Sequence, residues 1–314
     1  MTGFGLGPMP GTSMPEAADI VLGETGDLPH LPQLPDRGLG SDAIGRTAGL
    51  VEFVAVDRGP RAWQMTDRPQ LLTRRAWDRM ERDLDEIQDV WGESVPEVKI
   101  QAVGPWSLSA AIELANGHRV ITDSGARRDL FLGLQEGLAR HSADVARRFG
   151  AQVVLQLDEP YLGQILAGTL PGVTDFDDIA AVPAEVAADT LARFDSQYLH
   201  LDRPQWELAR TAQTVLLDLP QLVNPRDLDG LGQHLDAGSR VGLGITAADA
   251  VPGQPDTARG VAIAIARLLD RLGLPRTLLT HAVDVYPARP ESPARDYRLA
   301  YRVAAMLERD AGDL

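Results

Sequence analysis

Short apolar runs alternate with amphipathic stretches along most of the chain. The clearest run, residues 153–157, follows Gly150 and leads directly into Asp158, Glu159 and Pro160. Because a short run that is apolar on both faces is typical of a parallel sheet, it predicts a buried strand. Pro160 cannot extend a central strand, so Asp158 and Glu159 end it, at the edge where α/β folds bind ligands. The alternative is structural: the carboxylates accept hydrogen bonds from loop N–H groups.

The alternation extends over the whole sequence and predicts eight strand–helix units. Strands are expected at 3–7, 51–56, 98–103, 153–157, 198–201, 214–219, 240–245 and 278–283. Helices are expected at 15–23, 71–90, 108–116, 124–148, 184–194, 204–212, 225–237, 257–272 and 292–309. Alternation of this length favours a single-domain α/β protein, a (β/α)8 TIM barrel over residues 1–314. A doubly wound open sheet is the alternative.

A proline-rich segment interrupts the pattern between residues 24 and 46. Pro29, Pro32 and Pro35 are spaced by three, which is typical of a polyproline-like surface loop. The alternative is a loop folded over a site, with His30 and Arg37 facing a ligand.

Composition narrows the function classes. The 314 residues are 44% hydrophobic and carry a net charge of −15, which argues against nucleic acid and anionic membranes as partners because both need basic surfaces. The sequence contains no cysteine, so disulfides, cysteine-bound zinc and thiol nucleophiles are excluded. No apolar run approaches the length of a membrane span, and a cytoplasmic protein is expected. Neither a GxGxxG turn after a strand nor a P-loop is present.

Four short motifs, in this order, resemble segments of the cobalamin-independent methionine synthases. Residues 5–12 resemble the family's N-terminal Ile-Gly-Ser-x-Pro turn, and residues 26–32 resemble a short actinobacterial branch. Residues 104–107 (Gly-Pro-Trp-Ser) are similar to a Gly-Pro-x-Thr segment, and residues 156–160 (Gln-Leu-Asp-Glu-Pro) to Gln-x-Asp-Glu-Pro. The resemblance is to the C-terminal catalytic barrel of that family, within the uroporphyrinogen decarboxylase and methionine synthase-like superfamily.

The resemblance implies a methyltransferase of methionine biosynthesis, which moves a methyl group from a methylfolate, or from another donor such as a corrinoid protein, to the thiol of homocysteine. In the family a zinc ion binds that sulfur, held by His-x-Cys, Glu and Cys. Here the cysteines are missing: His200 and Asp202 stand at the His-x-Cys position, Asp218 stands at the Glu, and His281 lies near the last Cys. These four would form a nitrogen and oxygen site for zinc or another divalent metal. The alternative is that no metal binds.

The same resemblance assigns roles to individual residues. Asp158 would bind the α-ammonium of a small amino-acid substrate, Gly7 would offer backbone N–H groups to its carboxylate, and Trp106 would stack on a flat methyl donor. His200 and Asp218 are the expected catalytic residues. A metal-free family member that binds a small metabolite or acts within a complex is the alternative function. A uroporphyrinogen decarboxylase-like activity is disfavoured, because the N-terminal loop lacks the clustered arginines that a polycarboxylate needs.

Overall fold

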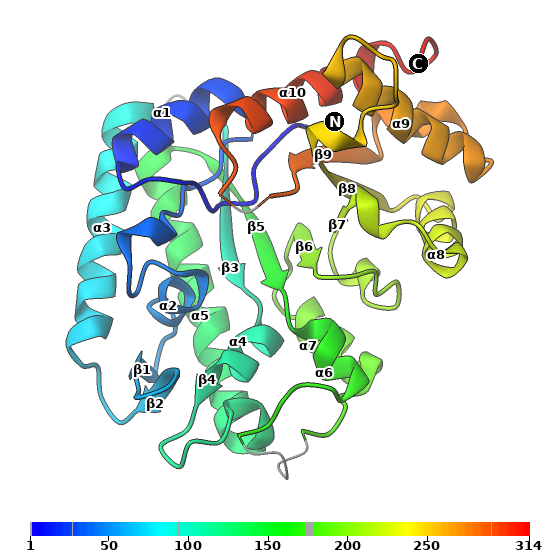
Figure 1. Ribbon diagram of the computed structural model, residues 1–314. Helices are drawn as coiled ribbons and strands as arrows, with labels where there is room; N and C mark the ends of the chain where they lie inside the picture. Colours follow the sequence, from blue (N-terminus) through cyan, green and yellow to red (C-terminus); the bar gives the residue numbers. More distant parts are fainter. Residues whose placement is uncertain (1, 27, 93–94, 174–178, 290) are drawn as a thin grey trace.

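A curled sheet of six parallel strands forms the centre of the computed structural model, which describes residues 2–26, 28–92, 95–173, 179–289 and 291–314 (Figure 1). The strands follow one another across the sheet in the order β3 (Glu97–Val103), β5 (Gln152–Glu159), β6 (Tyr198–Leu201), β7 (Thr214–Asp218), β8 (Arg240–Ile245) and β9 (Val283–Pro287). The protein is therefore a mixed α/β protein with a half-barrel of six strands, where the sequence predicted eight.

Two extended segments connect the outer edges of this sheet through single bridges. At one edge Gly3 pairs with Val285 of β9, and at the other His30 pairs with Lys99 of β3. Between them, the Gln33 N–H donates to the carbonyl of Gly7 at 3.0 Å. The expected strand at 3–7 thus makes isolated bridges only.

Helices cover the outer face of the sheet, and most of them lie where the spacing of apolar residues predicts. The long helices are α1 (Met14–Glu24), α3 (Leu71–Trp91), α5 (Ser124–Phe149), α8 (Pro225–Asp236), α9 (Thr257–Arg271) and α10 (Ala294–Arg309). The shorter ones are α2 (Ala43–Ala48), α4 (Pro105–Ala111), α6 (Leu162–Ala167) and α7 (Ala184–Ala192). Local signals set the ends of α5: Asp123 caps its first turn by accepting from the Ala126 N–H at 2.8 Å, and Gly150 ends it in a left-handed conformation. None of the helices in the described part of the chain is long and apolar enough to span a membrane.

Three further expected elements are wrong. The strand predicted at 51–56 is interrupted because Phe53 has a positive φ of 65°. The chain instead forms a separate sheet in which β1 (Ala55–Arg58) pairs antiparallel with β2 (Trp63–Thr66), and β2 pairs parallel with β4 (Ile112–Glu113). Residues 204–212 form turns and a short 3₁₀-helix where a longer helix was predicted. The last strand, predicted at 278–283, begins only at residue 283, because the preceding residues form the 3₁₀-helix Arg276–Thr280.

The proline-rich segment is packed inside the protein over much of its length, and it is not a surface loop. Leu28, His30, Leu31 and Leu34 are all buried, and the Leu31 N–H donates to the carbonyl of Lys99 at 2.9 Å. Of the motif at 26–32, residue 27 lies outside the described residues. His30 is therefore enclosed between secondary-structure elements and does not face a ligand.

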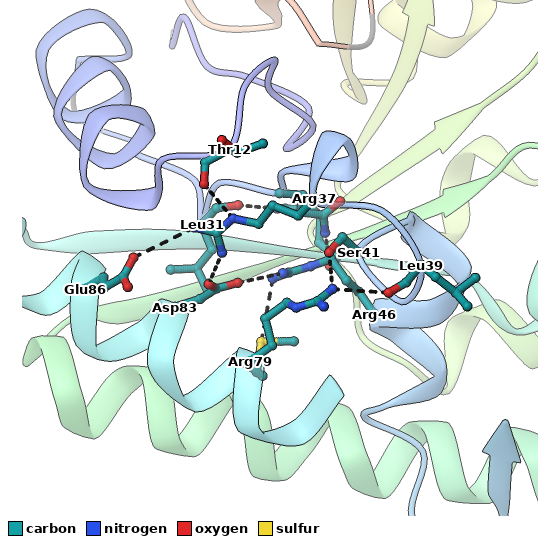
Figure 2. Close-up of polar contacts among 12 residues, drawn as sticks. Thr12, Leu31, Arg37, Leu39, Ser41, Arg46, Arg79, Asp83 and Glu86 are labelled. Atoms are coloured by element: carbon teal, nitrogen blue, oxygen red, sulfur yellow. Dashed lines mark hydrogen bonds and ion pairs between the residues drawn. The ribbon is translucent and has the colours of Figure 1, made fainter. Parts of the chain in front are cut away.

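The next part of this segment is fixed to α3 by a cluster of charges around Asp83 (Figure 2). Arg37 donates to one carboxylate oxygen of Asp83 at 2.5 Å, and Arg46 donates to the other at 3.1 Å. Arg79 donates to the side chain of Ser41. Arg37 is thus engaged with α3, so the alternative of a loop that presents it to a ligand does not hold.

The two faces of the curled sheet carry separate apolar clusters. Alternate residues such as Leu155 and Leu157 pack into the large cluster beneath the helices. A smaller cluster fills the inside of the curl and consists of Phe4, Leu6, Leu28, Val154, Tyr198, Leu216 and Tyr286. Because side chains alternate along a strand, Gln156 and Asp158 share the inner face with Val154. The inner face therefore changes from apolar to polar toward the carboxyl end of β5.

Candidate active site

The candidate site begins where Asp158 and His200 face each other at the carboxyl ends of β5 and β6. They are opposite each other in the parallel register, and Oδ1 of Asp158 lies 3.2 Å from Nδ1 of His200. The same oxygen accepts a hydrogen bond from Nε2 of Gln156 at 2.7 Å. Both side chains retain access to solvent, with 22% of Asp158 and 28% of His200 exposed. They form a supported carboxylate–imidazole pair that a ligand can reach.

Asp218 extends the site to the end of β7. Its Oδ1 accepts a hydrogen bond from the hydroxyl of Tyr286 at 3.1 Å, and the Tyr286 ring also meets the His200 ring edge-on at 6.0 Å between centroids. Burial raises the pKa of Asp218, and the nearby His200 opposes this. Gly244 leaves room for the carboxylate, because a Cβ there would lie 2.1 Å from it. The structure thus brings together three of the predicted residues, Asp158, His200 and Asp218.

Lys99 lies beneath this layer and was missed at the level of sequence. It is the only lysine in the chain, its side chain is fully buried, and its Nζ donates to Oε1 of Gln156 at 2.6 Å. Burial lowers the pKa of Lys99 to about 7, while the charge of Asp158 opposes the shift. The signal in the sequence was a single lysine in the middle of the otherwise buried strand at 98–103.

Gly7 lies against the side chain of Gln101, within the inner layer of the protein. Its φ is +128°, which side chains disfavour, and a Cβ would come within 2.6 Å of Nε2 of Gln101. Nε2 of Gln101 in turn donates to the carbonyl of Leu31. Close packing against Gln101 is therefore enough to explain a glycine at this position, whether or not Gly7 also binds a substrate carboxylate as predicted.

Trp106 is not available to stack on a methyl donor in this structure. Its side chain is 1% exposed, its indole N–H donates to the carbonyl of Ala187 at 3.3 Å, and its ring meets the edge of Phe131 at 5.2 Å. It packs between α4, α5 and α7. Trp106 is thus a packing residue of α4 in this structure, which differs from the role implied by the family resemblance.

Glu159 turns away from the site and caps α4. Its carboxylate accepts the backbone N–H groups of Trp106 at 3.0 Å and Ser107 at 2.7 Å. Burial raises the pKa of Glu159 to about 7, and these hydrogen bonds oppose the rise. Each of the two alternatives for this carboxylate pair therefore applies to one residue. Asp158 faces the site, and Glu159 has the structural role.

The four predicted metal ligands do not converge. His281 is exposed just before β9, at the amino edge of the sheet, where its carbonyl accepts from Arg240 at 2.8 Å. Asp202 accepts the N–H of Gly163 at 3.4 Å and pairs with Arg203 at 3.0 Å. Among the residues that the structure describes, no three His, Asp or Glu side chains are arranged to hold a metal ion. The side chains present do not fit the zinc ion that the family resemblance implies.

Comparison with known proteins places the fold. No family profile matches the sequence, and no curated protein matches it. A solved structure of a candidate vitamin-B12-independent methionine synthase from Listeria monocytogenes is similar, with 12% identity and a TM-score of 0.52 over 95% of this chain and 85% of that chain. A methyltransferase from Methanosarcina mazei is also similar, with 12% identity and a TM-score of 0.53 over 93% of this chain and 85% of that one. At this identity the likeness concerns the fold, which the chain shares with methionine synthase-like and methyltransferase structures.

Proposed function

We propose that the protein is a methionine synthase-like methyltransferase that transfers a methyl group to the thiol of homocysteine or a similar small amino acid. The observation that carries the proposal is the pair formed by Asp158 and His200, with 3.2 Å between Oδ1 and Nδ1, at the carboxyl ends of neighbouring strands. Ligands bind at this edge in open and closed α/β sheets. The fold shared with a methyltransferase and the motif at 156–160 support the same reading.

The proposal includes a complete (β/α)8 barrel. Residues 3–8 and 29–33 would take the positions of the two strands that the six-stranded sheet lacks. The bridges from Gly3 to Val285, from Pro8 to Gln33 and from His30 to Lys99 support this arrangement. A closed barrel would present the ends of all its strands to one ligand site.

The side chains of this chain suffice for the binding and proton steps. The carboxylate of Asp158 binds the substrate ammonium, a charge-assisted contact, with Asp218 as the second carboxylate of the site. With Nδ1–H of His200 donating to Asp158, Nε2 is the acceptor nitrogen of the ring. Nε2 takes the proton of the substrate thiol. The sulfur then uses an electron pair to form a bond to the methyl carbon as the donor–methyl bond breaks. The electron pair of the broken bond leaves with the donor.

A transfer assay tests the proposal. The protein is incubated with L-homocysteine and a deuteromethyl donor, either methyltetrahydrofolate or a methylcorrinoid protein, and labelled methionine is measured by mass spectrometry. We expect product, a fall in kcat of about 10²–10⁴-fold for His200→Gln as for loss of a general base, and mainly a higher KM for Asp158→Asn. If L-homocysteine neither binds at millimolar concentration nor is methylated by either donor, the proposal fails.

A metal-free protein that binds a small metabolite without turnover is the second candidate. It is favoured by the missing cysteines, by the position of His281 at the opposite edge of the sheet, and by the engagement of Asp202 with Gly163 and Arg203. A thermal-shift screen of amino acids separates the two candidates. Stabilisation that Asp158→Asn abolishes, together with no methyl transfer, supports this second function, whereas turnover excludes it.

A further inference from the structure

Lys99 is a buried ionisable group, and no carboxylate among the residues that the structure describes is in direct contact with it. Its side chain is fully buried and lies 5.5 Å above the ring of Phe4. Its hydrogen bond goes to the neutral amide of Gln156, at 2.6 Å, and within the described part of the chain it forms no ion pair. Removing a charge from water is costly unless it is compensated. An apolar residue at this position would avoid that cost, so the charge calls for an explanation.

The contacts of Gln156 supply one. Its Oε1 faces Lys99, while its Nε2 donates to the carbonyl of Leu6 at 3.1 Å and to Oδ1 of Asp158 at 2.7 Å. A lysine ammonium has donors and no acceptor. If the amide were flipped, Oε1 would face two acceptors and the NH₂ group would face the ammonium. Lys99 therefore adds to the preference of the amide for the orientation that donates to Asp158.

We propose that Lys99 is a positioning residue of the candidate site, which acts through the side-chain amide of Gln156 to hold the carboxylate of Asp158 in its ligand-binding orientation. In this orientation Oδ1 is occupied by Gln156 and His200. Among the described residues no hydrogen bond reaches Oδ2, which is left to bind a ligand ammonium. The part of the inference that concerns the ligand rests on the proposed function; the coupling of Lys99 to Asp158 does not.

The electrostatics of the site agree with this coupling. The groups that face Lys99 are the carboxylate of Asp158, the amide of Gln156, the ring of Phe4 and the buried His30. The Asp158 charge raises the pKa of Lys99 against the larger effect of burial. Burial, and then Lys99, hold the pKa of His30 well below its usual range, so His30 stays neutral and adds no second positive charge beside Lys99.

The single lysine permits a direct test on the ligand-free protein. Selective ¹⁵N-lysine labelling gives one side-chain NMR signal, that of Lys99, whose titration midpoint is measured in the wild type and in Asp158→Asn. We expect the midpoint to move to lower pH in Asp158→Asn, because the charge that stabilises the ammonium is lost. Glu159→Gln is the matched control: this neighbouring carboxylate caps α4, and its loss should leave the midpoint unchanged. A midpoint that Asp158→Asn leaves unchanged, or that Glu159→Gln moves equally, overturns the proposal.

Ligand binding provides the second test. Lys99→Met keeps the length and apolar stem of the side chain and removes its donors. With L-homocysteine as the titrant in calorimetry, we expect binding at least about tenfold weaker in this variant, a loss typical of a hydrogen bond to a charged group. Gln156→Met should weaken binding similarly, and the double variant should be no weaker than either single variant, because both act on the same carboxylate. Wild-type affinity in a folded Lys99→Met protein overturns the proposal.

The two tests separate this inference from the proposed function. If wild-type protein does not bind L-homocysteine, the proposed function fails, and the NMR midpoints alone decide whether Lys99 is coupled to Asp158. If Lys99→Met does not fold, the comparison of Asp158→Asn with Glu159→Gln decides the same question in proteins that retain the lysine.

Discussion

Asp158 and Glu159 are adjacent in the chain, and their carboxylates serve opposite faces of the sheet. Asp158 bonds to Gln156 and His200 on the inner face, whereas Glu159 bonds to the first turn of α4 on the outer face. The alternation of side chains along β5 enforces this division. One dipeptide therefore supplies a carboxylate to the candidate site and fixes the helix that follows the neighbouring strand.

Glu159 makes the stability of the protein depend on pH. Burial raises the pKa of its carboxyl from 4.5 to about 7 in the folded protein. Between these values the folded state binds the proton and the unfolded state does not, so this group's contribution to stability is greatest below pH 4.5 and is lost as the pH rises toward 7. As the pH rises across this interval, we expect the free energy of unfolding of the wild type to fall by on the order of 3 kcal/mol relative to that of Glu159→Gln. Urea unfolding of both proteins at several pH values measures the difference, and a pH-independent difference would contradict the prediction.

Gly7 is expected to tolerate no side chain. The substitution Gly7→Ala combines a φ of +128° with a contact of 2.6 Å to Gln101, and we expect it to lower the free energy of unfolding by about 2–4 kcal/mol. Gly232→Ala on α8 is the control, because its Cβ would meet nothing closer than 3.9 Å. A helical Gly→Ala change of this kind stabilises by up to about 1 kcal/mol. Equal effects of the two substitutions in chemical denaturation would refute the argument.

Much of the fold follows from periodicity, because burial on both faces marks the parallel strands and burial on one face marks the helices. The prediction of the strand at 153–157 and of the helix at 71–90 rested on these patterns, and β5 and α3 confirm them. Periodicity fails where the pairing partner is far away. Residues 28–34 are buried because they lie beside β3 and residues 3–8. The prolines in this segment are typical of a surface loop, so the sequence pattern does not indicate these neighbours.

The candidate site likewise contains some residues that could be predicted from the sequence and others that could not. The end of a strand identifies Asp158, and the family resemblance adds His200, which the parallel register then places opposite it. Tyr286 was missed because the last strand begins at residue 283, so that its end lies several residues beyond the predicted one. The same displacement put His281 at the wrong edge of the sheet. The role of Lys99 depends on which strand lies beside β3, and this cannot be read from the local sequence.

Metal ions should leave the stability of the protein unchanged. His200 is paired with Asp158, Asp202 with Arg203, and His281 lies at the opposite edge of the sheet. A ligand that binds only the folded state raises the melting temperature, so we expect no shift with zinc and none with EDTA. Differential scanning fluorimetry provides the measurement. A rise with zinc that is lost in His200→Gln and kept in His281→Gln would show that a metal site assembles around His200.

Asp83 is a buried carboxylate between two arginines, and we expect its replacement to destabilise the fold. It is 2% exposed and accepts from Arg37 and Arg46, and Arg46 is itself 9% exposed. Burial lowers the pKa of Arg46, and the charge of Asp83 opposes this. In Asp83→Asn the amide would accept one hydrogen bond but leave the buried guanidinium without its counter-charge, which typically costs about 3–5 kcal/mol.

The control for Asp83 is the second acid near Arg37. Glu86 lies 3.8 Å from Nη2 of Arg37, and 35% of its side chain is exposed. Exposed pairs contribute about 0–1 kcal/mol, so Glu86→Gln should be nearly neutral. Guanidinium chloride would mask these charges, so urea unfolding at low salt is the appropriate measurement. If both variants lose the same stability, burial of the Arg46 guanidinium is not the cause, and the cluster in Figure 2 acts as an ordinary surface ion pair.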